Sequence, residues 1–138
     1  EAERIGIAQL TNDFVDSVLA LDPRARVIVL GDLNDFHFSE AVSDVLAADI
    51  LTNLMYSLPI TDRYTYVFEG NSQVLDHILV SDGLMGAIGP DFDVVHVNAE
   101  FVADITSSSR RASDHDPVLA RFWLPPYHYY MPLIARND

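Results

Sequence analysis

The stretch VIVLGDLND, residues 27–35, runs from an unbroken apolar segment directly into a polar cluster. Its first four residues are apolar and mostly β-branched, which is typical of a buried strand. Asp32 and Asn34 follow two residues apart, so on an extended segment their side chains face the same side. Open sheets tend to place ligand sites where strands end, so the stretch predicts such a site here. The alternative is that Asp32 and Asn34 form a turn and bond their own backbone.

Helices are predicted on both sides of this strand. Residues 4–21 carry apolar side chains at steps of three and four, and Asp22 and Pro23 end the pattern. After the polar cluster, Ser39 is suited to cap a second helix over residues 40–56. The strand is therefore expected between two helices.

The rest of the chain is rich in strand signals. Strands are predicted over residues 64–68, 73–80, 92–98 and 117–123. The first two are expected to form a hairpin, and residues 81–91 and 104–113 to form loops. The pattern predicts an α/β (α+β) domain over residues 1–124, with one mixed β-sheet and two helices on its outer face. Residues 125–138 are interpreted as a tail or linker.

Charge and composition restrict the chemistry. The 138 residues carry a net charge of −13, all eight basic residues are Arg, and there is no Cys. Disulfides and thiolate metal sites are excluded, and the compartment stays open, a secreted or periplasmic one included. No apolar run approaches the length that spans a bilayer. A surface this acidic repels phosphate esters, so such a substrate needs a bound cation or an Arg cluster.

A second polar cluster interrupts the apolar strand predicted over residues 73–80. Asp76 and His77 stand between apolar neighbours. A carboxylate in that setting is costly unless it is paired with a cation, a His or a metal. The alternative is that strand twist exposes both side chains at a sheet edge.

The third cluster is SDHDPV, residues 113–118, with Arg110 and Arg111 just before it. His115 titrates near neutral pH and can serve as a general base or phosphate ligand, while Asp114 can bind a metal. The two Arg side chains can neutralise a substrate phosphate. The alternative is a loop-to-strand junction in which acidic residues cap the turn.

Taken together and in this order, the GDLN, LDHILV and SDHDPV motifs resemble the endonuclease/exonuclease/phosphatase superfamily of metal-dependent phosphodiesterases. The resemblance covers about residues 4–123, and residues 63–81 are most similar to bacterial extracellular nucleases. It implies that Asp32 activates or orients the attacking water and that Asn34 holds this water and the scissile phosphate. Asp76 would orient His115, and His115 would contact the phosphate.

The resemblance also implies a cofactor and a substrate class. Asp114 and Asp32 would bind Mg²⁺ (or Mn²⁺ or Ca²⁺), and Arg110 and Arg111 would lie near the substrate phosphate. The expected substrate is nucleic acid. A phospholipid or a small phosphoester is the alternative. A non-catalytic interaction module that keeps the fold, and an unrelated domain with scattered clusters, are the competing interpretations.

The matched motifs belong to the C-terminal half of that family's four-layer α/β sandwich. The N-terminal half contributes an Asn, a metal-binding Glu and a further His, and these have no counterpart here. The start at Glu1, without Met, suggests processing or a cut. We therefore expect the isolated chain to be inactive. We also expect an exposed sheet face that favours a homodimer or a complex with the missing half.

Overall fold

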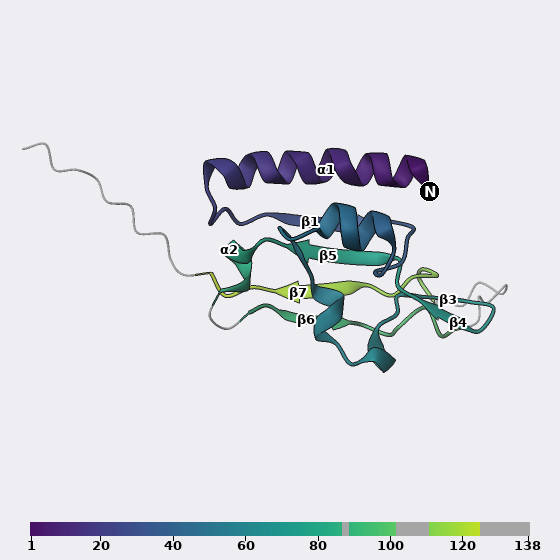
Figure 1. Ribbon diagram of the computed structural model, residues 1–138. Helices are drawn as coiled ribbons and strands as arrows, with labels where there is room; N and C mark the ends of the chain where they lie inside the picture. Colours follow the sequence, from purple (N-terminus) through teal and green to yellow (C-terminus); the bar gives the residue numbers. More distant parts are fainter. Residues whose placement is uncertain (87–88, 102–110, 125–138) are drawn as a thin grey trace, which may run out of the picture.

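The computed structural model describes residues 1–86, 89–101 and 111–124, and its elements form an α+β fold, which confirms the predicted class (Figure 1). The helices are α1 (Ala2–Leu21), the π-helix η1 (Glu40–Ala47), the 3-10 helices η2 (Leu54–Ser57) and η3 (Ile60–Asp62), and α2 (Asp82–Met85). The strands are β1 (Ile28–Asp32), β2 (Thr52–Asn53), β3 (Tyr66–Phe68), β4 (Asn71–Gln73), β5 (Asp76–Val80), β6 (Asp91–Val94) and β7 (Val118–Arg121).

The strands form three antiparallel sheets within the described residues, so the predicted single mixed sheet is wrong. The first has the order β1-β5-β2, and β3-β4 and β6-β7 form the other two. The difference arises at Val74 and Leu75, where the run predicted as one strand leaves β4 and enters β5. The β4 part pairs with β3, as the predicted hairpin requires, while β5 pairs with β1.

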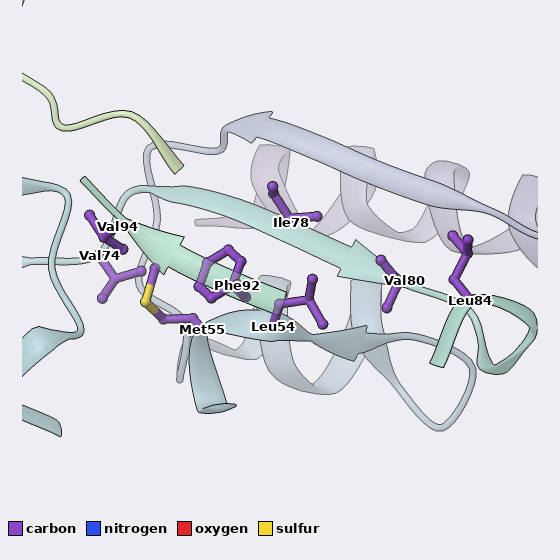
Figure 2. Close-up of a cluster of buried hydrophobic side chains, with 8 residues drawn as sticks. All are labelled: Leu54, Met55, Val74, Ile78, Val80, Leu84, Phe92 and Val94. Atoms are coloured by element: carbon purple, nitrogen blue, oxygen red, sulfur yellow. The ribbon is translucent and has the colours of Figure 1, made fainter. Parts of the chain in front are cut away.

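Strand β5 lies at the centre of the molecule because apolar side chains cover both of its faces. On one face, Leu79 packs among α1 and η1, together with the small residues Ala8 and Ala41. On the other face, Ile78 and Val80 share a cluster with Leu54, Met55, Val74, Leu84, Phe92 and Val94 (Figure 2). This second cluster holds the β6-β7 sheet beside β5, as Figure 1 also shows.

The predicted helix over residues 40–56 is shorter than expected. It ends at Ala47, and Ala48 has a positive φ of 40°, which ends the helical path. The chain then forms β2 and η2. Asn53 begins η2, because its side chain accepts a hydrogen bond from the backbone N–H of Met55. Because the helix ends at Ala47, the chain turns inward and Asn53 is buried.

Helix α1 is confirmed, but the stripe that predicted it faces solvent. Ile7, Leu10 and Phe14 are 60%, 72% and 67% exposed, whereas Ala8 and Val15 are buried. The helix approaches η1 through its small residues, and a large apolar stripe stays on the surface. Within the described residues, no helix combines the length and apolar character needed to cross a bilayer. The predicted tail, residues 125–138, lies outside the described residues.

Candidate active site

Two of the predicted site residues face each other across a strand pair. In the antiparallel pair β1–β5, Asp32 lies directly opposite Asp76. Opposed residues in such a pair project on the same face, within a few ångströms of each other. Two carboxylates at that spacing repel unless a positive group lies nearby. The strand register therefore places two negative charges side by side, and a metal ion or a protonated His between them would reduce their repulsion.

The turn after β1 holds Asn34 against Asp32. The backbone N–H of Asn34 donates to Oδ1 of Asp32 at 2.9 Å, and its Nδ2 donates to Oδ2 at 3.3 Å. Asn34 adopts a positive φ of 49°, a conformation that Asn tolerates better than most residues. Gly31 has a φ of 153°, which side-chain-bearing residues rarely adopt. The turn that was the alternative interpretation is thus present, and it keeps the amide beside the carboxylate.

His115 completes a three-residue cluster. Its Nδ1 lies 2.6 Å from Oδ2 of Asp76, and both side chains are about four-fifths buried. One possible ligand atom from each of Asp32, Asp76 and His115 lies within 4.8 Å of the others. Asp32 ends β1, Asp76 begins β5, and His115 precedes β7. Residues from three separate motifs therefore converge, and the interpretation with scattered clusters does not hold for them.

Electrostatics favour a charged His115. Burial lowers the pKa of His115, but the hydrogen bond and charge of Asp76 outweigh it. Smaller contributions come from Asp32 and Asp114, and the pKa is raised above its usual value of 6.5. The raised pKa favours the imidazolium, in which Nδ1 donates to Asp76. No residue that the structure describes hydrogen-bonds Nε2, so in this form its N–H can bind an anion such as a phosphate oxygen.

The donor chemistry of this cluster fits a hard divalent cation. Nδ1 of His115 is engaged by Asp76, and the cluster's oxygen ligands are the carboxylates of Asp32 and Asp76. Mg²⁺ prefers oxygen donors and is usually held by one or two carboxylates while it keeps several waters. Asp32 is exposed at the cluster and forms no ion pair with an arginine in the described parts of the chain. Asp32 is therefore the residue best placed to hold a cation.

Thr65, which sequence reasoning did not single out, ties the motifs together. It is fully buried, and its Oγ1 accepts hydrogen bonds from the backbone N–H groups of Leu75 and Asp76. Its carbonyl oxygen accepts a hydrogen bond from the N–H of Asp116 at 2.7 Å. One residue thus fixes the backbone at Asp76 and also next to His115. The sequence signal for a buried Thr65 was its position between two tyrosines in a strand whose side chains alternate between faces.

Asp116 was also missed, and it holds the backbone of residues 97–99 next to the segment that carries His115. Its Oδ1 accepts hydrogen bonds from the backbone N–H groups of residues 97, 98 and 99. Its Oδ2 lies 2.9 Å from Nδ1 of His96. Burial raises the pKa of Asp116, but these hydrogen bonds outweigh it and hold the pKa below its usual value. The second Asp beside His115 was the sequence signal.

His77 points away from the cluster, although it follows Asp76 directly. It is fully buried: Asn53 Nδ2 donates to its Nδ1 at 3.1 Å, and its Nε2 lies 2.9 Å from the carbonyl oxygen of Asp35. Nδ1 accepts from Asn53, so Nε2 carries the proton and donates to the carbonyl of Asp35. Burial, the largest influence on the pKa of His77, lowers it and favours this neutral form. The alternative that strand twist exposes both residues is therefore wrong.

The other predicted site residues near the third motif do not belong to the cluster of Asp32, Asp76 and His115. Asp114 is exposed and is not among the three clustered ligands, although its charge reaches His115. Arg111 donates to two backbone carbonyls, those of Ser113 and Phe101, so its guanidinium links these two positions. Arg110 lies outside the described residues. Roles for Asp114 in metal binding and for both arginines in phosphate binding stay predictions.

Tyr66 touches the cluster from β3. It forms an isolated β-bridge with His115, and the two ring centroids lie 4.8 Å apart. The aromatic alternation of residues 64–68 predicted the strand but not this contact. The ring of Tyr66 therefore forms one wall beside His115.

Comparison with known proteins gives one match. A model described as "Endonuclease/Exonuclease/phosphatase family" matches residues 1–114, which include Asp32, Asn34, Asp76 and Asp114. Neither the curated proteins nor the solved structures contain a match.

Proposed function

The chain belongs to the endonuclease/exonuclease/phosphatase family, and from that premise we propose that it forms part of a divalent-metal-dependent phosphodiesterase that acts as a nuclease. Members of this family are hydrolases, so the proposal concerns the bond and the substrate. The observation that carries it is the hydrogen bond between His115 and Asp76, with the carboxylate of Asp32 within 4.8 Å. This arrangement offers a carboxylate oxygen and an imidazole N–H donor close together.

The proposed reaction is in-line attack of water on a phosphodiester. Asp32 accepts a proton from the water as its oxygen bonds to phosphorus, and Asn34 holds the water or a phosphate oxygen. The bond from phosphorus to the leaving oxygen breaks, that oxygen takes a proton from solvent water, and Asp32 returns its proton to solvent. The Nε2–H of His115 stabilises charge on the phosphate, while Asp76 keeps the ring in the orientation that does so.

We propose Mg²⁺ as the cofactor, held by Asp32 with Asp114 as a second ligand. When bound, such an ion neutralises negative charge on the phosphate as the reaction proceeds. The acidic chain supports this assignment, because a net charge of −13 repels phosphate unless a cation is recruited first. Nucleic acid as the substrate is supported by the resemblance of residues 63–81 to bacterial extracellular nucleases.

We further propose that residues 1–124 form the C-terminal half of a larger domain. Two features support this. Strand β1 is an edge of its sheet in the described structure, with Leu30 64% exposed. The apolar stripe of Ile7, Leu10 and Phe14 is also open to solvent. We propose that a missing half or a second copy covers these surfaces, and that the isolated chain is inactive.

A hydrolysis assay tests this function. A single-stranded oligonucleotide with Mg²⁺ is incubated with the chain and with a longer form that carries its natural upstream sequence. The longer form should cleave, and the isolated chain should be slower by at least about 1,000-fold, the scale of lost catalytic groups. His115→Ala and Asp32→Asn should abolish cleavage by the longer form, and the exposed Asp91→Asn should not. Cleavage that survives His115→Ala and Asp32→Asn would overturn the proposal.

A further inference from the structure

The β3-β4 hairpin presents an organised face of aromatic rings and carboxamides. Tyr66 and Phe68 are two residues apart on β3, so they share one face. Their rings stack with centroids 6.4 Å apart and planes 14° apart. Across the hairpin, Gln73 lies opposite Tyr66 and Asn71 lies opposite Phe68. Opposed residues project on the same side, so two carboxamides flank two stacked rings.

This face begins at the candidate active site. The ring of Tyr66 lies 4.8 Å from that of His115, centroid to centroid, and the two residues form a β-bridge. Phe68 continues the row outward and is 50% exposed. A ligand whose phosphate contacts His115 therefore has an aromatic surface immediately beside that phosphate.

The core does not account for these side chains. Phe68 and Tyr66 belong to neither buried hydrophobic cluster. The side chains of Asn71 and Gln73 form no hydrogen bond with any residue that the structure describes. Among the described residues, an exposed aromatic ring thus lies beside carboxamides that form no hydrogen bond, which suits a ligand with a flat ring and polar edges. The hairpin sequence YVFEGNSQ, residues 66–73, carries no basic residue, so the face is not built to grip a phosphate backbone.

We propose that Tyr66, Phe68, Asn71 and Gln73 form a subsite that stacks a nucleobase of the substrate strand beside the phosphate held at His115. The inference rests on the proposed nuclease function and adds the part of the substrate that is recognised. Stacking on an aromatic ring accepts any base, because every base has a π-face. Carboxamides bind base edges as donors and acceptors. Stacking also suits an acidic protein, since it needs no cation.

The order of the side chains gives each a role. Tyr66 is the inner ring and contacts His115, so it positions the nucleotide nearest the reacting phosphate. Phe68 is the outer and more exposed ring, so it carries the open stacking surface. The flanking carboxamides disfavour a lipid acyl chain, which offers them no hydrogen-bonding partner.

A pair of matched ligands tests the subsite by binding rather than by turnover. One is a thymidine trinucleotide with phosphorothioate links, and the other is an abasic trinucleotide of the same length and charge. Each is titrated into the full chain with Mg²⁺ while the ring signals of Tyr66 and Phe68 are followed by NMR. The base-bearing ligand should bind about 10-fold tighter, on the scale of one stacked base, and should shift both rings.

Three variants locate the effect. Phe68→Ala should bring the affinity ratio of the two ligands close to one, and Phe68→Leu should do nearly the same, because it keeps apolar bulk without the ring. Phe14→Ala removes another exposed ring, on α1, and should leave the ratio unchanged. An amide spectrum that matches the wild type outside the hairpin confirms that each variant is folded.

The results separate failure of the subsite from failure of the proposed function. Three results would overturn the subsite. The wild type could bind both ligands equally or bind neither, or Phe68→Ala could keep the preference for the base-bearing ligand. The subsite is also overturned if the wild type binds phosphatidylcholine vesicles, Phe68→Ala does not, and the two nucleotide ligands bind with equal affinity. That result would assign the face to lipid. If Mg²⁺ and Asp32→Asn affect neither ligand while the ratio stays near 10, the hydrolase proposal fails and the subsite remains.

Discussion

Nδ1 of His115 lies 2.6 Å from Oδ2 of Asp76, although 39 residues separate them in the sequence. Asp76 begins the central strand β5, and His115 lies just before β7, which belongs to another sheet. Thr65 joins the two segments, because it binds the backbone of Asp76 and of Asp116. The contact is therefore built into the packing of the sheets.

Removing the charge of Asp76 should lower the pKa of His115. In Asp76→Asn the main influence that raises this pKa is gone, and burial, which lowers it, remains. A titration of the His115 ring by NMR measures the change directly. The exposed Asp91→Asn should leave the His115 titration unaltered. An unchanged His115 pKa in Asp76→Asn would show that the hydrogen bond does not form in solution.

The same pair should make stability depend on pH above neutrality. Because the folded-state pKa of His115 is raised, its contribution is fully present below the unfolded value near 6.5. The contribution is lost as pH rises through the folded pKa. The free energy of unfolding of wild type minus that of Asp76→Asn should therefore be larger at pH 6 than at pH 9. Urea denaturation measures it, and a larger difference at pH 9 would contradict the assignment.

Asp116 should matter for stability rather than for the reacting phosphate. Asp116→Asn weakens a buried, multiply hydrogen-bonded carboxylate and should cost about 3 kcal/mol at pH 6. Its folded-state pKa is depressed, so this contribution is present above the unfolded value near 3.8. It should shrink as pH falls through the folded pKa. A cost that is the same at pH 6 and pH 3 would contradict the depressed pKa.

The exposed apolar stripe on α1 should drive association. Leu10→Glu with Phe14→Glu adds charge to a surface that is now 72% and 67% exposed at these side chains. We expect the wild type to form dimers in light scattering and to bind a hydrophobic dye, and the double variant to do neither. Glu substitutions at the exposed polar positions Gln9 and Ser17 serve as the control. A wild type that stays monomeric without binding the dye would contradict the expected association.

Local patterns in the sequence predicted much of the fold. The apolar run before Asp32 predicted β1, and the periodicity of residues 4–21 predicted α1, because each signal lies within one element. The convergence of Asp32, Asp76 and His115 was expected through the resemblance of their motifs. The structure supplies the pairing that creates it, since Asp32 opposes Asp76 across β1 and β5.

What the sequence did not predict depends on long-range partners. The switch between sheets at Val74 and Leu75 carries no turn residue, so one continuous strand was predicted. Ala48 ends a helix with a positive φ and without a Gly or Pro to mark it. Asp116 acts through backbone N–H groups 17 to 19 residues away, which no local pattern reveals. The apolar stripe of α1 was visible, but its exposure depends on which helix face meets η1.

The most direct test of the converging site is paramagnetic broadening by Mn²⁺ in NMR spectra of the chain. At low Mn²⁺, the first signals to broaden should be those of Asp32, Asp114 and the Asp76–His115 pair. Asp32→Asn should weaken Mn²⁺ binding by at least about 10-fold, and Asp91→Asn should not. Broadening that begins elsewhere, or equal Mn²⁺ affinity in Asp32→Asn, would contradict a metal-assisted phosphate site at this end of β1 and β5.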